Sequence, residues 1–185
     1  MSETPHHPEH SGEAITILKV DPILKTGIAV STPAQGPDGR LEDRHSAYHD
    51  NISPPLAWTA VPDVKTWAVV VEDPDAPQDK PFVHWMIWNI PGSVRGLPEG
   101  LPNTPALVTP QGALQGRNGM HSPGWFGPRP PAGHGLHHYY FQVFALDDAI
   151  DMGPETTLPE LLNALKARTL ASGELVVTYE APTRQ

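Results

Sequence analysis

The chain has 185 residues, which suits one compact domain, and its net charge of -9 with only 12 Lys and Arg argues against a nucleic-acid surface or a basic membrane-docking patch. Cysteine is absent, which excludes disulfide bonds and thiolate metal sites. No apolar run approaches the roughly 20 residues that span a bilayer, and no basic segment followed by an apolar core opens the chain, so we expect a cytoplasmic protein without stable membrane insertion.

The N-terminal part of the chain is predicted to be a tail followed by two short strands. Residues 1–12 are polar and aperiodic, which indicates a disordered tail ahead of a single domain at 13–185. The tail holds three histidines, and both a solvated tract and a nickel-binding tail are consistent with them. Alternating apolar residues predict a strand within 14–20, and a second at 27–30. The histidines of the tail are His6, His7 and His10.

Two apolar runs in the middle of the chain predict central strands. Residues 66–72 (TWAVVVE) and 82–90 (FVHWMIWNI) are too short for ordinary helices and rich in β-branched or aromatic side chains. The prolines between them cannot donate to a strand ladder and force a rigid irregular loop. Residues 91–134 carry proline and glycine throughout, which predicts an extended connection with one or two brief strands.

The C-terminal part is predicted to contain a strand, a helix and a last strand. Residues 138–146 alternate in the manner of a strand packed on both faces. Thr157 is a suitable N-cap for a helix, and Gly173 is interpreted as ending the turn before a strand at 174–179. The fold class is therefore mainly β: a sandwich with the helix packed at its edge and long loops rich in Pro and Gly.

Three side chains stand where the predicted strands could bring them together. Asp73 follows one buried strand, His84 lies in the next, and His137 precedes the third. A carboxylate near His84 would fix its tautomer and favour the imidazolium, which is a donor for an anion such as a phosphate ester. His137 would supply a second donor. We therefore expect an anion pocket around these residues.

Structural interpretations compete with this one. Asp73 could be a turn carboxylate that caps backbone N–H groups, and His84 a half-buried histidine in a strand. Asp75 is interpreted as closing an Asx turn within its loop. Neither His134 nor His138 has a comparable context.

Four motifs together resemble the phosphatidylethanolamine-binding protein family, in particular its bacterial branch of Raf kinase inhibitor-like proteins. Their order and spacing cover most of residues 14–180, and a coincidence at four places is not credible. The motifs are NISPPLAW at 51–58, DPDAP at 73–77, His84-Trp85 leading into NIP at 89–91, and GPRPPAGHGLHHY at 127–139 continuing into FALD at 144–147.

The resemblance implies a β-sandwich of two antiparallel sheets with a small pocket that takes phosphate-bearing head groups and small anions. It implies no cofactor. By motif, the ligand-binding positions are Asp73, Pro77, His84, Pro130, Pro131, His137 and Tyr139.

The chain departs from the bacterial pattern at residues 118–121 (NGMH), where relatives carry an acidic residue, an aromatic residue and glycine. Trp125 stands where relatives have an aromatic residue, and Trp85 is interpreted as a pocket or a core residue. Arg129 could contact a phosphate or lie exposed at the rim.

Three functions are consistent with these residues. The first is binding of a small phosphorylated or carboxylated molecule, with modulation of other proteins. The second is inhibition of a kinase or serine protease through the surface, an analogy of fold and motif. The third is a metal-dependent enzyme that uses Asp73, His84 and His137, but no nucleophile accompanies them, and we expect no enzyme and no metal. A homodimer is plausible, whereas binding of a whole phospholipid is not expected, because a small pocket need not accept acyl chains.

Overall fold

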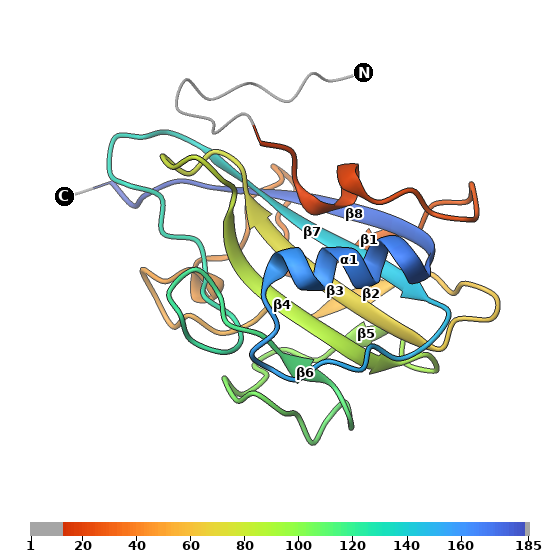
Figure 1. Cartoon of the computed structure of the whole chain (residues 1–185). Helices are drawn as coiled ribbons and strands as arrows, with labels where there is room; N and C mark the ends of the chain where they lie inside the picture. Colours follow the sequence, from red (N-terminus) through yellow and green to blue (C-terminus); the bar gives the residue numbers. More distant parts are fainter. Residues whose placement is uncertain (1–12, 184–185) are drawn as a thin grey trace.

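A computed structural model of the protein describes residues 13–183, as two antiparallel β-sheets with one α-helix (Figure 1). The expected tail and its histidines lie outside the described residues. The smaller sheet has the order β1-β2-β5 and the larger one β6-β4-β3-β7-β8. The smaller sheet consists of β1 (Val30–Ser31), β2 (Leu56–Trp58) and β5 (Gly96–Leu97), and the larger one of β3 (Thr66–Asp73), β4 (Phe82–Pro91), β6 (Leu114–Gln115), β7 (His137–Leu146) and β8 (Thr169–Tyr179).

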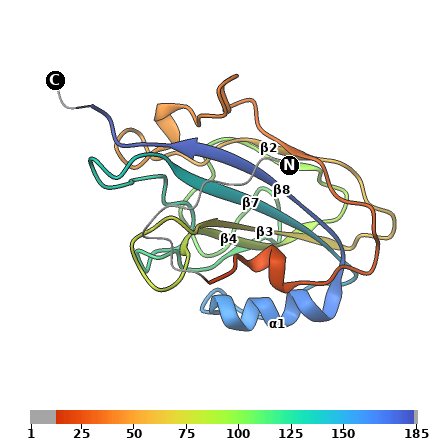
Figure 2. The ribbon, with the colours of Figure 1, turned by 90° about the horizontal axis from the view of Figure 1, so that it is seen from above.

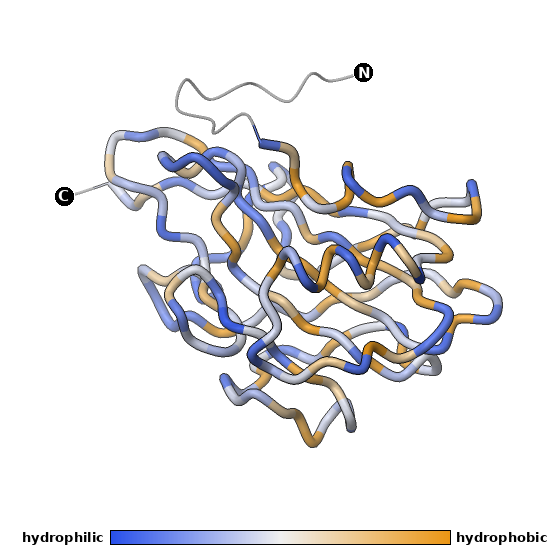
Figure 3. Tube along the Cα trace, viewed as in Figure 1, coloured by the Kyte–Doolittle hydropathy of each residue, from blue (hydrophilic) through white to orange (hydrophobic). Residues whose placement is uncertain are grey.

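The central strands are confirmed, and the hydrophobic runs explain their position. All eight residues of β3 are buried, as a strand in the middle of a covered sheet requires. Figure 3 shows apolar residues along these strands and hydrophilic ones in many of the loops. The irregular loop after β3 and the two brief strands β5 and β6 within 91–134 are also as predicted.

Apolar side chains fill both faces of the larger sheet. One core lies between the sheets and includes Trp67, Trp85 and Phe141. The other lies under α1 (Leu158–Arg168), where Leu161 and Leu165 pack among apolar side chains of the larger sheet. Figure 2 shows α1 and β2 on opposite sides of the larger sheet. The helix therefore covers a sheet face, and the prediction that it packs at the edge is wrong.

The N-terminal segment is a 3-10 turn, η1 (Thr16–Lys19), where a strand was expected. Its backbone N–H groups bond to side chains: Thr16 N donates to Glu72 Oε1 at 2.8 Å, and Ile17 N donates to Gln142 Oε1 at 2.7 Å. Because these buried side-chain acceptors take the place of a strand ladder, the alternating pattern gives no strand. The second expected strand, at 27–30, is realised only at its end, in β1.

The last strand begins earlier than predicted, directly after α1. Gly173 lies inside β8, opposite Val143, and not in a turn. A β-carbon at Gly173 would come within 1.8 Å of the carbonyl oxygen of Ile28. The glycine is therefore needed for the close approach of a neighbouring backbone. No helix among residues 13–183 is long and apolar enough to cross a membrane.

Candidate functional site

The expected site residues meet at one end of the larger sheet. β3 is antiparallel to both β4 and β7, so the end of β3 lies beside the starts of the other two strands. Asp73 is the last residue of β3, His84 lies near the start of β4, and His137 opens β7. Strand pairing thus brings together three side chains that are far apart in the sequence.

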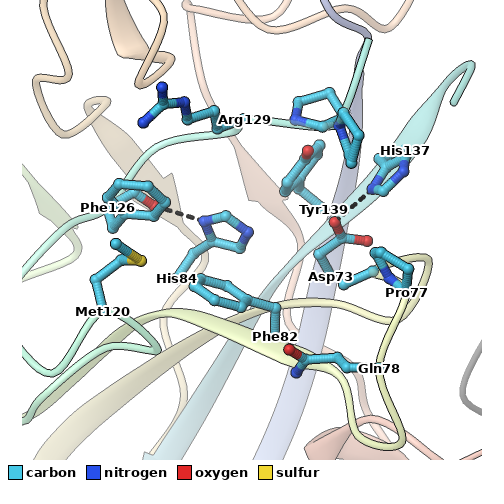
Figure 4. A pocket seen from close by; sticks show the side chains of 13 residues that line it. Asp73, Pro77, Gln78, Phe82, His84, Met120, Phe126, Arg129, His137 and Tyr139 are labelled. Carbon is cyan, nitrogen blue, oxygen red and sulfur yellow. Dashed lines mark hydrogen bonds and ion pairs between the residues drawn. The ribbon is translucent and has the colours of Figure 1, made fainter. Parts of the chain in front are cut away.

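A cavity of about 260 Å³ lies at this end of the sheet (Figure 4). All seven positions that the sequence motifs indicated line it. Six further residues complete the wall. The lining consists of Asp73, Ala76, Pro77, Gln78, Phe82, His84, Met120, Phe126, Arg129, Pro130, Pro131, His137 and Tyr139.

The carboxylate of Asp73 is held by two groups. Its Oδ1 atom accepts a hydrogen bond from the backbone N–H of Asp75 at 2.8 Å, and its Oδ2 atom lies 2.7 Å from Nδ1 of His137. The second ring nitrogen of His137 lies 2.6 Å from Nδ1 of His134. Both ring nitrogens of His137 are therefore engaged inside the protein. The predicted role of His137 as a direct donor to the anion does not fit this geometry, and the capping role considered for Asp73 is present.

A second aspartate–histidine pair lies beside the first. Oδ2 of Asp75 accepts from the backbone N–H of His138 at 2.8 Å and lies 2.7 Å from its Nδ1. Burial raises the pKa of Asp75, but the hydrogen bonds from His138 and the electrostatic interactions with His138 and His137 together outweigh it, so the pKa is lowered overall. Asp75 thus ties its loop to β7, where a local Asx turn was predicted, and His138 has a structural partner that the sequence did not reveal.

The imidazole of His84 is oriented by a backbone carbonyl. Its Nδ1 atom lies 2.5 Å from the carbonyl oxygen of Phe126, and because a carbonyl only accepts, Nδ1 carries a proton. Burial lowers the pKa of His84 below its ordinary value, against the opposing effects of Asp73 and of this hydrogen bond. The tautomer is therefore fixed by a backbone carbonyl and not by the predicted carboxylate, and Asp73 does favour the imidazolium as predicted but is outweighed by burial.

Tyr139 brings a hydroxyl group without a partner. The side chain is fully buried, and its Oη atom has no hydrogen-bond partner among the described residues. Figure 4 shows Tyr139 between His84 and the pair formed by Asp73 and His137. Burial, reinforced by the charges of Asp73 and Asp75, raises the pKa of Tyr139 well above its ordinary value, so the phenol keeps its proton as a donor.

An apolar wall faces these polar groups, and sequence reasoning missed it. The ring of Phe82 lies 4.8 Å from that of His84, and the ring of Phe126 is stacked on His84 at 6.0 Å. Met120 reaches the cavity from the segment that departs from the bacterial pattern. Gly119 lets that segment lie against Phe82, because a β-carbon there would come within 2.5 Å of the ring. Nothing in the local sequence marks these three residues as one surface.

The comparisons with known proteins agree with this arrangement. The family model described as phosphatidylethanolamine-binding protein matches residues 31–180. The chain belongs to the phosphatidylethanolamine-binding protein family.

Archaeal and bacterial members of the family are similar along most of their length. A UPF0098 protein of Methanothermobacter thermautotrophicus is 38% identical over 151 residues, which are 81% of this chain and 97% of that protein. Escherichia coli YbcL, whose crystal structure is described as a new member of the mammalian family, superposes with a TM-score of 0.77 at 32% identity, over 85% of this chain and 100% of YbcL. The homologue CT736 of Chlamydia trachomatis superposes with a TM-score of 0.74 at 29% identity, over 84% and 99% of the two chains.

In this family member, the two tryptophans considered for the pocket lie in the core. The indole N–H of Trp85 donates to Gln115 Oε1 at 2.8 Å, and that of Trp125 donates to the carbonyl oxygen of His45 at 3.0 Å. Arg129 is exposed at the rim, with its guanidinium 5.8 Å from the ring centre of Tyr48. Arg129 is thus exposed, as the rim interpretation has it, and it also lines the cavity.

The metal-dependent alternative finds no support among the described residues. They contain no group of three or more His, Asp or Glu side chains that could hold a metal ion. Two of the three side chains that this alternative uses as metal ligands, Asp73 and His137, are hydrogen-bonded to each other.

The burial of His84 predicts a loss of stability in mild acid. Folding lowers the pKa of His84, so the contribution of this residue to the free energy of unfolding is complete above the unfolded pKa of about 6.5. As the pH falls from there toward the folded pKa, this contribution is lost by at most about 1.4 kcal/mol per pH unit. His84→Gln is expected to remove this part of the decline. Urea unfolding of both proteins between about pH 8 and about pH 5 measures it. The exposed His49 provides the control, and an H49Q variant with the same loss of slope would contradict the assignment.

Proposed function

We propose that the protein binds a small molecule that places an anionic group at the polar end of the cavity and an apolar substituent against its apolar wall. The polar end consists of His84, Tyr139 and Asp73, and the apolar wall of Phe82, Phe126 and Met120. The unpartnered hydroxyl of Tyr139 carries this proposal, because a buried O–H group without a partner is costly and a bound oxyanion would accept from it.

The size of the cavity limits the ligand. Its volume of about 260 Å³ is just below the usual range of small-molecule pockets, about 300–1,000 Å³. It suits a head group with one ring or a short chain, and not the acyl chains of a complete phospholipid. Pro77, Pro130 and Pro131 line the wall without contributing a backbone N–H, so we expect specificity to come from the few polar side chains.

Calorimetric titration with phenyl phosphate and with inorganic phosphate tests the proposal. Phenyl phosphate is expected to bind about tenfold more tightly or better, because its ring removes apolar area from water against the two phenylalanines. His84→Ala is expected to weaken the binding of both ligands by about tenfold or more, since one of the polar groups of the cavity is lost.

The exposed His49 gives a matched control, because H49A removes the same kind of side chain away from the cavity. If neither ligand bound at about millimolar concentration, the proposed function would be wrong. A dissociation constant of about 1 mM corresponds to a binding free energy near -4 kcal/mol. If phosphate and phenyl phosphate bound equally, the apolar half of the proposal would fail.

Inhibition of a kinase or a serine protease stays a prediction from the family resemblance, because no described surface feature favours it over ligand binding. A homodimer and a cytoplasmic location likewise stay predictions. A catalytic role is not proposed, since the site offers binding groups without a nucleophile beside them.

A further inference from the structure

We infer that the pocket binds its anion together with one proton, and so selects oxyacid groups that can be protonated on binding over anions of the same shape that cannot. A phosphate monoester and a carboxylic acid belong to the selected class. The inference rests on the proposed function and deepens it by naming the chemical state of the ligand.

The orientation of His84 is the first argument. Its Nδ1 proton is committed to the carbonyl oxygen of Phe126, so the neutral ring presents a lone pair, and not a proton, at Nε2. Among the described residues no group hydrogen-bonds to Nε2, and Figure 4 shows this nitrogen on the side of the ring toward Asp73. A deprotonated oxyanion placed here would meet a second acceptor.

The charges around the ring point the same way. From β3, Asp73 contributes a carboxylate whose oxygens already accept from Asp75 and His137. From β7, His137 has both ring nitrogens engaged, with Asp73 and with His134. Arg129 is the only permanent cation of the lining, and it is exposed over the ring of Tyr48. The polar end therefore presents the negative charge of the Asp73 carboxylate and the lone pair of His84 Nε2 to a ligand.

Tyr139 supplies the one O–H donor that the polar end holds without a partner. The rings of His84 and Tyr139 lie 5.1 Å apart and meet edge to face. An oxyacid group with one O–H and one free oxygen complements this pair: its O–H donates to Nε2 of His84, and its oxygen accepts from Tyr139. If the proton moves to Nε2, only an O–H bond breaks and an N–H bond forms, and the complex holds the same number of protons.

The lowered pKa of His84 acts in the same direction, because burial keeps the ring neutral near pH 7. A ligand that brings no proton must then obtain one from solvent against that shift. Its affinity is reduced accordingly.

Phenyl phosphate and phenyl sulfate provide the test. Both have the same shape, and at about pH 6 about half of the phosphate is a monoanion with an O–H group, whereas the sulfate is a monoanion without one. We expect phenyl sulfate to bind at least about 30-fold more weakly at this pH, since a group built to pair with an O–H rejects an analogue that lacks it. Above about pH 6, the affinity for phenyl phosphate is expected to fall about tenfold per pH unit.

Titration of acetate at about pH 7.5 in two buffers with different ionisation enthalpies counts the protons directly, since carboxyl groups are ionised well below this pH. About one proton is expected to be taken up per acetate. His84→Gln presents an amide that donates as well as accepts, and is expected to bring phenyl phosphate and phenyl sulfate within about threefold of each other. H49Q is the matched control and should keep the discrimination of the unchanged protein.

The outcomes separate this inference from the function on which it rests. Equal affinities for phenyl phosphate and phenyl sulfate, without pH dependence or proton uptake, would overturn the inference and leave a plain anion site. Absence of binding for phenyl phosphate, phenyl sulfate and acetate alike would overturn the proposed function itself. Preserved discrimination in H84Q would show that His84 does not hold the proton.

Discussion

Tyr139→Phe is expected to weaken the binding of phenyl phosphate by about 10- to 150-fold without destabilising the protein. The loss corresponds to one hydrogen bond to a charged group, about 1.5–3 kcal/mol. Stability is preserved because the hydroxyl of Tyr139 is buried without a partner in the unliganded protein, so its removal breaks no bond. Calorimetric titration and urea unfolding of the same preparation measure the two effects.

The combination of the two results makes this variant informative. Tyr179, also fully buried, bonds through its hydroxyl to Asp43 Oδ1 at 2.9 Å and to Ser46 Oγ at 3.0 Å. The matched control Y179F is therefore expected to lose stability and keep its affinity. If Y139F bound phenyl phosphate with an affinity within about twofold of that of the unchanged protein, the loss would be far smaller than one hydrogen bond accounts for. The hydroxyl of Tyr139 would then have no role in the site.

Gly173→Ala is expected to lower the free energy of unfolding by about 3 kcal/mol or more, the upper range for overpacking. The added β-carbon would come within 1.8 Å of the carbonyl oxygen of Ile28, and a backbone atom cannot swing aside as a side chain can. Either β8 or the segment before β1 must move, and the hydrogen bond from Ile28 N to Ser172 O is expected to break. Urea unfolding measures the effect.

Gly27 provides the control, since an added β-carbon there would meet nothing closer than Ser172 O, at the ordinary contact distance of 3.7 Å. G27A is expected to change the free energy of unfolding by less than about 1 kcal/mol. A G173A protein as stable as G27A would show that the two segments do not approach as closely as the structure indicates.

The sequence alone determined those elements whose local pattern is compatible with only one kind of structure. The run at 66–72 is apolar on both faces, so only the middle of a covered sheet accommodates it. Thr157 caps α1 as predicted, within a capping box completed by Glu160, because both partners of this interaction lie in one helical turn. The same holds for the loop after β3, whose prolines exclude a regular element.

The motifs also located the wall of the site, but not the roles of its members. All seven predicted residues line the cavity, since four of them lie near strand ends that meet in the antiparallel sheet and the three prolines lie in the loops that adjoin these ends. Phe82, Phe126 and Met120 were missed, because an apolar side chain beside a pocket has the same local signature as one in the core.

What only the tertiary structure decided are the contacts between residues that are distant in the chain. The state of His84 depends on the carbonyl of Phe126, 42 positions away, and the partner of Asp73 is His137, 64 positions away. The close approach at Gly173 depends on the backbone of Ile28. The periodicity of a segment is a local property, and the sequence shows it directly. The position of a proton on His84 and the close backbone approach at Gly173 depend instead on atoms of residues far away in the chain. Only the packing of the whole fold decides which of these atoms come into contact.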